Sequence, residues 1–156
     1  MGEEEWRIKI VGPLGIYAMS DDFIPKDKLC AELGLDASKE IILVIQHPVQ
    51  FKRAGEQMRQ TLDAVKGFQT VVIYPNNDPG NEDMVREIGS VMSFKFLPYM
   101  KFISLVKASD VVVGNSSAGL YDAPFFGVPS INIGDRQHNR ECGKNVLQCP
   151  HDTKMI

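Results

Sequence analysis

Cysteines are scarce in this chain, positive charge is not in excess, and long apolar segments are missing. The 156 residues include three cysteines, a sparse and odd set that is typical of a reducing cytosol rather than of a disulfide framework. Lys and Arg number 17 against 20 Asp and Glu, so the net charge of −3 excludes the basic surface of a nucleic-acid-binding protein. The longest apolar run, Ile41 to Ile45, is too short to cross a bilayer.

The first residues do not have the pattern of a signal peptide, because Glu3, Glu4 and Glu5 stand where basic residues and then an apolar run would be needed. We therefore expect a soluble, cytoplasmic protein that binds neither a membrane nor nucleic acid. Cys142, Cys149 and His151 match no paired metal-binding spacing. We expect ordinary buried or surface thiols there, and no metal site.

The length suits one well-buried domain, and no repeat, low-complexity tract or linker divides residues 1–156. Short β-rich runs alternate with segments of helical period. Strands are predicted at residues 8–11, 41–45, 71–74, 94–97, 110–113, 130–133 and 146–147. Helices are predicted at residues 25–33, 54–65, 99–106 and from the 114–119 turn to about residue 126. A further helix, which carries Met84, Val85 and Ile88, is predicted after the polar turn at residues 76–80. This alternation predicts right-handed βαβ units and an α/β fold with a doubly wound parallel sheet.

Ligands of such sheets bind beyond the carboxyl ends of the strands. Four turns at these ends carry most of the small, polar and ionisable residues: 46–48, 75–77, 114–119 and 134–140. In the third turn, Ser116 and Ser117 lie between two glycines, and their hydroxyl and N–H groups at a helix start suit a phosphate. The alternative is that Asn115 or Ser116 only caps the helix. The turn does not have the pattern of a Walker loop.

Five polar residues elsewhere likewise allow both a ligand-binding and a purely structural interpretation. Asp122 lies more than one turn into the same predicted helix, where its carboxylate would bind both hydroxyls of a ribose or would simply be solvated. Arg136 and Arg140 could bind a diphosphate or be ordinary surface residues. His47 either contacts a ligand or transfers a proton, or is a structural histidine. Asn76 either forms a turn or binds a base or sugar.

The turns taken together resemble one enzyme family, the UDP-N-acetylglucosamine 2-epimerases. The resemblance extends from about Arg7 to the end of the chain and rests on strand-end motifs in the family's order: Gln46-His47-Pro48-Val49, Tyr74-Pro75-Asn76, Phe96-Leu97-Pro98-Tyr99, Gly114-Asn115-Ser116-Ser117 and Asn132-Ile133-Gly134-Asp135-Arg136-Gln137. The stretch from Arg140 to Val146 is similar to the hydrolysing branch of that family.

The resemblance implies a two-domain fold of the glycosyltransferase-B type, of which this chain is the Rossmann-like, UDP-binding C-terminal half. The N-terminal half is absent, and the full-length enzyme would be a homo-oligomer without a cofactor. The implied ligands are UDP and UDP-N-acetylglucosamine. The roles carried over are diphosphate binding by Ser116 and Ser117, ribose binding by Asp122, contact with the UDP moiety by Arg136, a nucleotide pocket lined by Asn76 and the backbone of Leu97, and substrate binding and catalysis by His47.

Two features point to the hydrolysing reaction, which releases UDP and N-acetylmannosamine for sialic-acid-type sugars. Pro48 replaces the arginine of the non-hydrolysing enzymes, and these enzymes lack the Gly134 to Gln137 pattern. By the resemblance, the acidic residues that remove the C2 proton belong to the missing half, so we expect the isolated chain to be inactive. A glycosyltransferase-B sugar transferase and a catalytically silent nucleotide-binding module are the alternatives.

Overall fold

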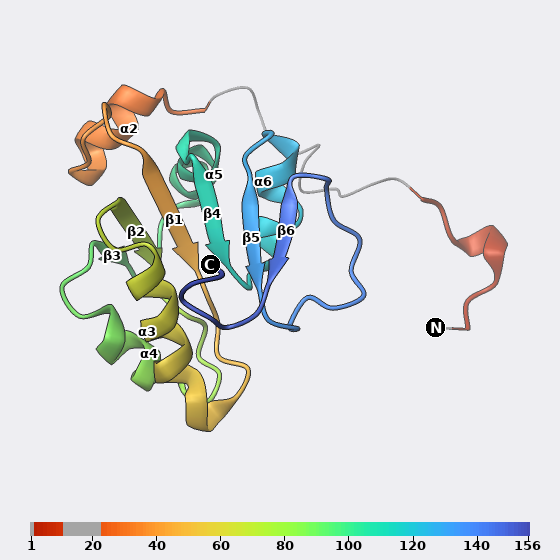
Figure 1. The fold of residues 1–156 in the computed structure, drawn as a ribbon. Helices are drawn as coiled ribbons and strands as arrows, with labels where there is room; N and C mark the ends of the chain where they lie inside the picture. Colours follow the sequence, from red (N-terminus) through yellow and green to blue (C-terminus); the bar gives the residue numbers. More distant parts are fainter. Residues whose placement is uncertain (1, 11–22) are drawn as a thin grey trace.

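Short apolar segments form the centre of the fold, which a computed structural model describes for residues 2–10 and 23–156 (Figure 1). The described strands are all parallel and follow the order β3-β2-β1-β4-β5-β6. Their bounds are β1 Ile41–Ile45, β2 Gln69–Ile73, β3 Ser93–Phe94, β4 Val111–Gly114, β5 Ser130–Ile133 and β6 Val146–Cys149. This order confirms the predicted doubly wound sheet.

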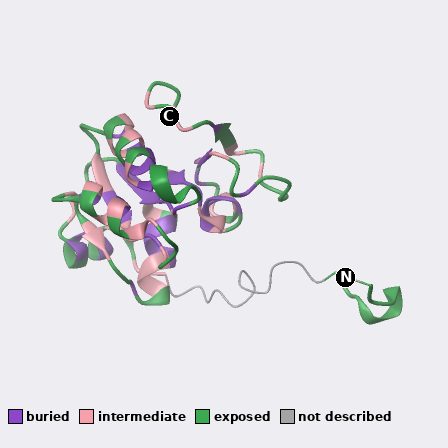
Figure 2. Cartoon of the chain, turned by 90° about the horizontal axis from the view of Figure 1, so that it is seen from below, coloured by how far each residue is buried: buried purple, intermediate pink, exposed green. Residues whose placement is uncertain are grey.

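Helices cover both faces of the sheet, as the continuous apolar sequence of β1 requires. The helices are α2 Lys26–Leu33, α3 Ala54–Ala64, α4 Asn81–Ile88, α5 Tyr99–Ala108 and α6 Asp122–Phe125. Ile41, Leu43 and Ile45 pack in one cluster with α2, α5 and α6. Ile42 and Val44 pack in a second cluster with α3 and α4. Figure 2 shows the buried residues concentrated in the strands between these two layers.

Helix α5 carries the chain from the edge strand β3 to the centre of the sheet, where β4 pairs with β1. The chain leaves β1 toward β2 on one side and leaves β4 toward β5 on the other. The carboxyl ends of β1 and β4 are therefore the switch point of the sheet, which is the usual ligand position in such folds. The residues after Ile45 and Gly114 lie at this switch point because the two are paired in register.

Two predicted elements are wrong. Residues 8–10 form no strand, and Ile10 is 99% exposed. None of the strands in residues 23–156 pairs with this segment; residue 11 lies outside the described residues. The predicted continuous helix to residue 126 is instead a 3-10 turn, Ser117–Gly119, followed by α6. Pro124 has no N–H to continue the helical hydrogen bonds from the preceding turn, so α6 begins anew at Asp122.

Candidate functional site at the ends of β1 and β4

The close contact between β1 and β4 depends on a residue without a side chain. Gly114 ends β4 with φ of +139°, and a Cβ there would lie 2.1 Å from the carbonyl oxygen of Ile45. The two strand ends stay in contact at the next residue, where the N–H of Asn115 donates to the carbonyl oxygen of Ile45 over 3.1 Å. Glycine at this position therefore lets the two strand ends meet at the switch point.

The Asn115 side chain joins the two strand ends beyond this contact. The N–H of His47 donates to Asn115 Oδ1 over 2.7 Å, and Asn115 Nδ2 donates to the carbonyl oxygen of His47 over 2.9 Å. The carbonyl oxygen of Asn115 accepts from Arg136 Nη1 at 3.1 Å and from Gln137 Nε2 at 2.7 Å. Asn115 is only 1% exposed, so a single buried residue connects the ends of β1, β4 and β5.

The imidazole of His47 is half-buried beside these bonds. Its Nδ1 accepts the N–H of Asn76 over 3.1 Å. Burial, and then the positive charge of Arg136, lower the pKa of His47 below its ordinary value of 6.5, although Asp78 acts in the opposite direction. Burial and Arg136 thus both favour the neutral form of the ring. We call His47, Asn76, Asn115, Ser116 and Arg136 the strand-end cluster.

Asn76 has an acceptor that nothing in the described chain satisfies. Its Nδ2 donates to Asp78 Oδ2 over 2.6 Å, but its buried Oδ1 has no hydrogen-bond partner. Leu97 lies further along, with its side chain buried in the core and its neighbour Phe96 exposed. No described residue forms a hydrogen bond with the backbone of Leu97. Both positions thus have polar atoms without a hydrogen-bond partner among the described residues.

The capping interpretation is confirmed for Ser116, whose Oγ accepts the N–H of Ala118 over 3.4 Å, and not for Asn115. Asp122 is the first residue of α6, rather than a residue inside a longer helix. Burial raises the pKa of its half-buried carboxyl group. No described residue pairs with that carboxylate, and no hydrogen bond links Asp122 or Leu97 to the strand-end cluster.

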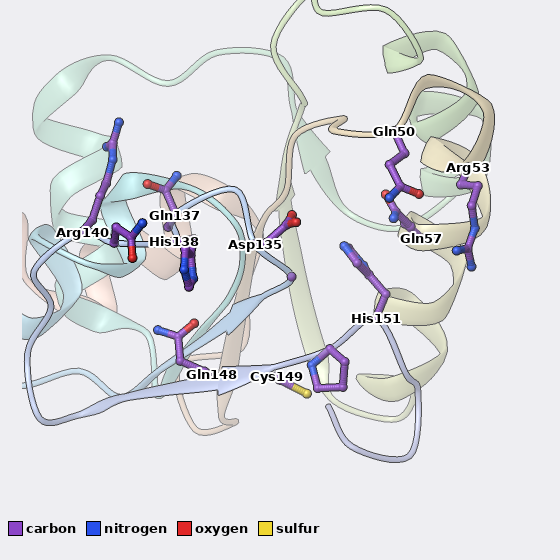
Figure 3. A pocket seen from close by; sticks show the side chains of 13 residues that line it. Gln50, Arg53, Gln57, Asp135, Gln137, His138, Arg140, Gln148, Cys149 and His151 are labelled. Atoms are coloured by element: carbon purple, nitrogen blue, oxygen red, sulfur yellow. The ribbon is translucent and has the colours of Figure 1, made fainter.

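A pocket of about 760 Å³ lies beside the cluster, between the start of α3 and the turns after β5 and β6 (Figure 3). Its lining is rich in amide, guanidinium and imidazole side chains: Gln50, Arg53, Gln57, Gln137, His138, Arg140, Gln148 and His151, among others. It contains none of the seven predicted site residues, but Asp135 and Gln137 line it on either side of Arg136 in the sequence. The pocket and the cluster therefore share the turn after β5.

Sequence reasoning missed the roles of Asn115 and Gln137 and the side chains that α3 contributes. Gln57 gave one usable signal, because it lies on the buried face of α3 with Ala54, Met58 and Thr61.

The expectation of ordinary thiols is confirmed: Cys30 and Cys149 are buried, Cys142 is exposed, and all three are free. Within the described residues, no group of potential ligands could hold a metal ion, and no helix is long and apolar enough to span a membrane.

Comparisons of the sequence and of the fold with known proteins both find UDP-N-acetylglucosamine 2-epimerases. The profile of the UDP-N-acetylglucosamine 2-epimerase family matches residues 1–156. The UDP-N-acetylglucosamine 2-epimerase of Neisseria meningitidis is 32% identical over an alignment of 173 positions. The alignment covers 100% of this chain and 44% of that protein. The hydrolysing GDP/UDP-N,N'-diacetylbacillosamine 2-epimerase of Campylobacter jejuni is 30% identical, over 94% of this chain and 42% of that protein. The polysialic acid biosynthesis protein P7 of Escherichia coli is 28% identical, over 100% and 43%.

Solved structures extend the likeness to the fold. The N. meningitidis UDP-GlcNAc 2-epimerase bound to UDP-GlcNAc superposes with a TM-score of 0.56 at 15% identity, covering 83% of this chain and 37% of that one. The E. coli ADP-heptose heptosyltransferase II superposes with a TM-score of 0.55 at 16% identity, covering 79% and 42%. The sheet is thus of the glycosyltransferase-B type, and the chain spans less than half the length of the curated relatives it matches. Because the family profile matches residues 1–156 of this chain, the chain belongs to the UDP-N-acetylglucosamine 2-epimerase family.

Proposed function

We propose that this chain is the UDP-binding, C-terminal domain of a hydrolysing UDP-N-acetylglucosamine 2-epimerase, which gives UDP and N-acetylmannosamine for sialic-acid-type sugars. The observation that carries the proposal is the strand-end cluster, which gathers hydrogen-bonding groups at the switch point of a parallel sheet and includes the Asn76 Oδ1, an acceptor without a partner among the described residues. The hydrolysing C. jejuni relative and the E. coli polysialic acid protein support the reaction and its biological role.

The diphosphate of UDP would bind Arg136 and the hydroxyl groups of Ser116 and Ser117. Arg136 supports this role because its guanidinium is exposed and makes a single hydrogen bond, through Nη1, to a described residue. The three residues are brought to one place because Asn115 precedes the serines and binds Arg136 through its carbonyl oxygen. Guanidinium and hydroxyl donors together suit a phosphate oxygen.

The nucleoside would extend from there toward Asp122, Asn76 and the backbone of Leu97. The unpaired Asp122 carboxylate is an acceptor for the two ribose hydroxyls. The unpartnered Oδ1 of Asn76 is an acceptor for an N–H of the base or a hydroxyl of the ribose. Both roles follow the family resemblance, and both use atoms without a hydrogen-bond or ion-pair partner among the described residues.

The sugar would enter the pocket beside the cluster, since Asp135 and Gln137 join that pocket to Arg136. Its amide side chains suit the hydroxyl and acetamido groups of a hexosamine. Removal of the C2 proton needs a base on the sugar side. Because the chain spans 44% of its N. meningitidis relative, we assign that base to the N-terminal half and expect the isolated chain to bind UDP without turnover.

Calorimetric titration with UDP, with uridine for comparison, tests this function. We expect saturable binding that requires the diphosphate. The double variant Ser116→Ala/Ser117→Ala should weaken UDP binding by about 1–3 kcal/mol, because hydrogen bonds to a charged group are lost. Uridine binding should not change. An equal loss with uridine would contradict the diphosphate assignment, and folded protein that binds no UDP would contradict the proposed function.

A sugar transferase of the same fold is the second candidate, supported by the likeness to the E. coli heptosyltransferase. Competition between UDP and ADP, followed by incubation of a full-length enzyme with nucleotide sugar and an acceptor, separates the two candidates. Saturable UDP binding without turnover, even with an N-terminal half added, would indicate a silent binding module. We also propose a cytoplasmic location, which the three free thiols support, and a homo-oligomeric full-length enzyme.

A further inference from the structure

The imidazole of His151 lies against the backbone of Gly134, at the start of the turn after β5. Gly134 has φ of +73°, and a Cβ placed there would lie 2.7 Å from Nε2 of the ring and 3.1 Å from its Cδ2. Atoms in contact normally stay about 3.5–4 Å apart, so the ring fills the space that a side chain at position 134 would need. Figure 3 shows His151 extending from the turn after β6 toward Asp135, the next residue of the turn after β5.

The turn after β5 carries two side chains that bind the carbonyl oxygen of Asn115. Arg136 Nη1 donates to that oxygen over 3.1 Å, and Gln137 Nε2 donates to it over 2.7 Å. The start of the turn is attached to the end of β6, because the N–H of Gly134 donates to the carbonyl oxygen of Cys149 over 2.8 Å. A shift of Gly134 would therefore move Arg136, the residue that we assign to the diphosphate.

The residues that carry the ring are held by the fold on both sides in the sequence. Strand β6 ends two residues before His151. After it, Thr153 Oγ1 donates to the carbonyl oxygen of Gln60 in α3 over 3.1 Å. The N–H of Asp152 also donates to the carbonyl oxygen of Pro150 over 2.9 Å. The ring thus projects onto Gly134 from a backbone that is anchored to the sheet and to α3.

The ring acts on the turn through its shape. Its buried Nδ1 has no hydrogen-bond partner in residues 2–10 or 23–156, and Nε2 is the ring atom nearest to the Cβ position of Gly134. Burial, and then the positive charge of Arg53, lower the pKa of His151, although Asp135 acts in the opposite direction. A neutral ring without a bonded protein partner affects its neighbour by packing.

We propose that His151 is a positioning residue for the diphosphate site: its ring packs on Gly134 and holds the turn after β5 in the conformation that presents Arg136. The inference rests on the proposed UDP site and adds to it a residue that acts through the turn rather than on the nucleotide. Glycine is needed at position 134 for the same reason, because a side chain there would push the ring off the turn.

A double-mutant cycle on Gly134 and His151 tests the contact, with calorimetric titration of UDP as the measurement. His151→Ala should weaken UDP binding about tenfold, within the range of coupling between residues in contact. Gly134→Ala should weaken it by a similar factor in the parent, because the new methyl group displaces the ring. In the His151→Ala background, where no ring remains, the same change should cost less than about threefold. Equal factors in the two backgrounds would overturn the inference.

Gly127→Ala is the matched control for backbone strain. Gly127 has φ of +72°, and a Cβ there meets nothing within 4 Å. The variant therefore carries the strain of Gly134→Ala without a collision, and we expect UDP affinity to change by less than about twofold. A loss as large as that of Gly134→Ala would attribute the effect to strain alone and contradict the role of the ring.

Uridine separates positioning from general stability, because it lacks the diphosphate. His151→Ala should bind uridine as well as the parent does, and equal losses for UDP and uridine would make His151 merely structural. His151→Phe keeps a flat ring and should bind UDP within about threefold of the parent. A Phe variant as weak as the Ala variant would assign the role to a ring nitrogen and overturn the packing argument.

Failure of the proposed function gives a different result from failure of this inference. A folded parent that binds no UDP would contradict the proposed function. The same cycle, measured as the free energy of unfolding in urea, would still test the contact: we expect Gly134→Ala to cost less stability in the His151→Ala background than in the parent. Equal costs would overturn the inference whatever the chain binds.

Discussion

Replacing Gly114 by alanine adds one methyl group at the point where β1 and β4 meet. The new Cβ would lie 2.1 Å from the carbonyl oxygen of Ile45 and 2.6 Å from its carbonyl carbon. Real Cβ atoms stay beyond about 3 Å from such neighbours, so the strand ends must separate. The φ of +139° adds strain for any residue with a side chain.

The expected loss can be worked from these contacts. Strain in a φ region reserved for glycine costs about 1–3 kcal/mol. Separation of the strand ends weakens three hydrogen bonds, one from Asn115 to Ile45 and two between His47 and Asn115, at about 0.5–1.5 kcal/mol each. We therefore expect Gly114→Ala to lower the free energy of unfolding by about 2.5–7.5 kcal/mol and to abolish UDP binding.

Urea unfolding followed by far-UV circular dichroism measures this loss, because the single tryptophan, Trp6, is 74% exposed and is a poor probe of the core. Gly67→Ala is the matched control: its φ is +99°, but a Cβ there meets nothing within 4 Å. That variant carries backbone strain without the collision. Losses for the two variants that agree within about 0.5 kcal/mol would refute the argument that Gly114 is needed for the close contact.

Three further predictions concern ionisable groups. Asp122→Asn should be more stable than the parent at pH 7, because burial raises the pKa of the Asp122 carboxyl group above 3.8 and makes its ionised form costly. The same variant should bind UDP more weakly. Urea titrations at several pH values should show the difference in unfolding free energy between variant and parent shrinking as the pH falls toward 3.8. The parent should lose stability as pH falls below 6.5, since both His47 and His151 have lowered pKa values in the folded chain. Replacing both histidines by Gln should reduce that loss. Parent and double variant that lose the same unfolding free energy on acidification would contradict this prediction. A thiol reagent should modify Cys142 alone in the native chain, and Cys30 and Cys149 only after unfolding, as mass spectrometry can count.

Most strand positions could be predicted from the sequence, because the strands coincide with apolar runs that end at turn-forming residues. The run at Ile41–Ile45 is buried along its whole length, as predicted for a strand covered on both faces. Residues 8–10 have the same β-branched character, but strand formation also needs a neighbouring strand, which composition does not encode. The break before α6 was visible as Pro124, yet its position in the first turn depends on where the helix begins.

The site was predictable at the level of turns and not at the level of contacts. A parallel sheet gathers all strand ends at one edge, so His47 and Arg136 could be nominated together. The Asn115 side chain, however, binds a backbone 68 residues away, and no local pattern distinguishes that role from helix capping. Gln57 and the other pocket residues likewise depend on how α3 packs against the turn after β5.

The polar interactions that hold the site together leave its charged groups unpaired. Ion pairs among the described residues, such as Lys101 with Glu32 and Arg59 with Glu87, lie away from the strand-end cluster and include neither Arg136 nor Asp122. The backbone at the switch point is instead held by the neutral amide groups of Asn115 and Gln137. A diphosphate or a ribose can therefore bind without breaking an ion pair. Since separating a pair costs much of what a new one gains, the unpaired Arg136 would favour the anionic diphosphate of the proposed ligand, and the unpaired Asp122 carboxylate would stay an acceptor for ribose hydroxyls.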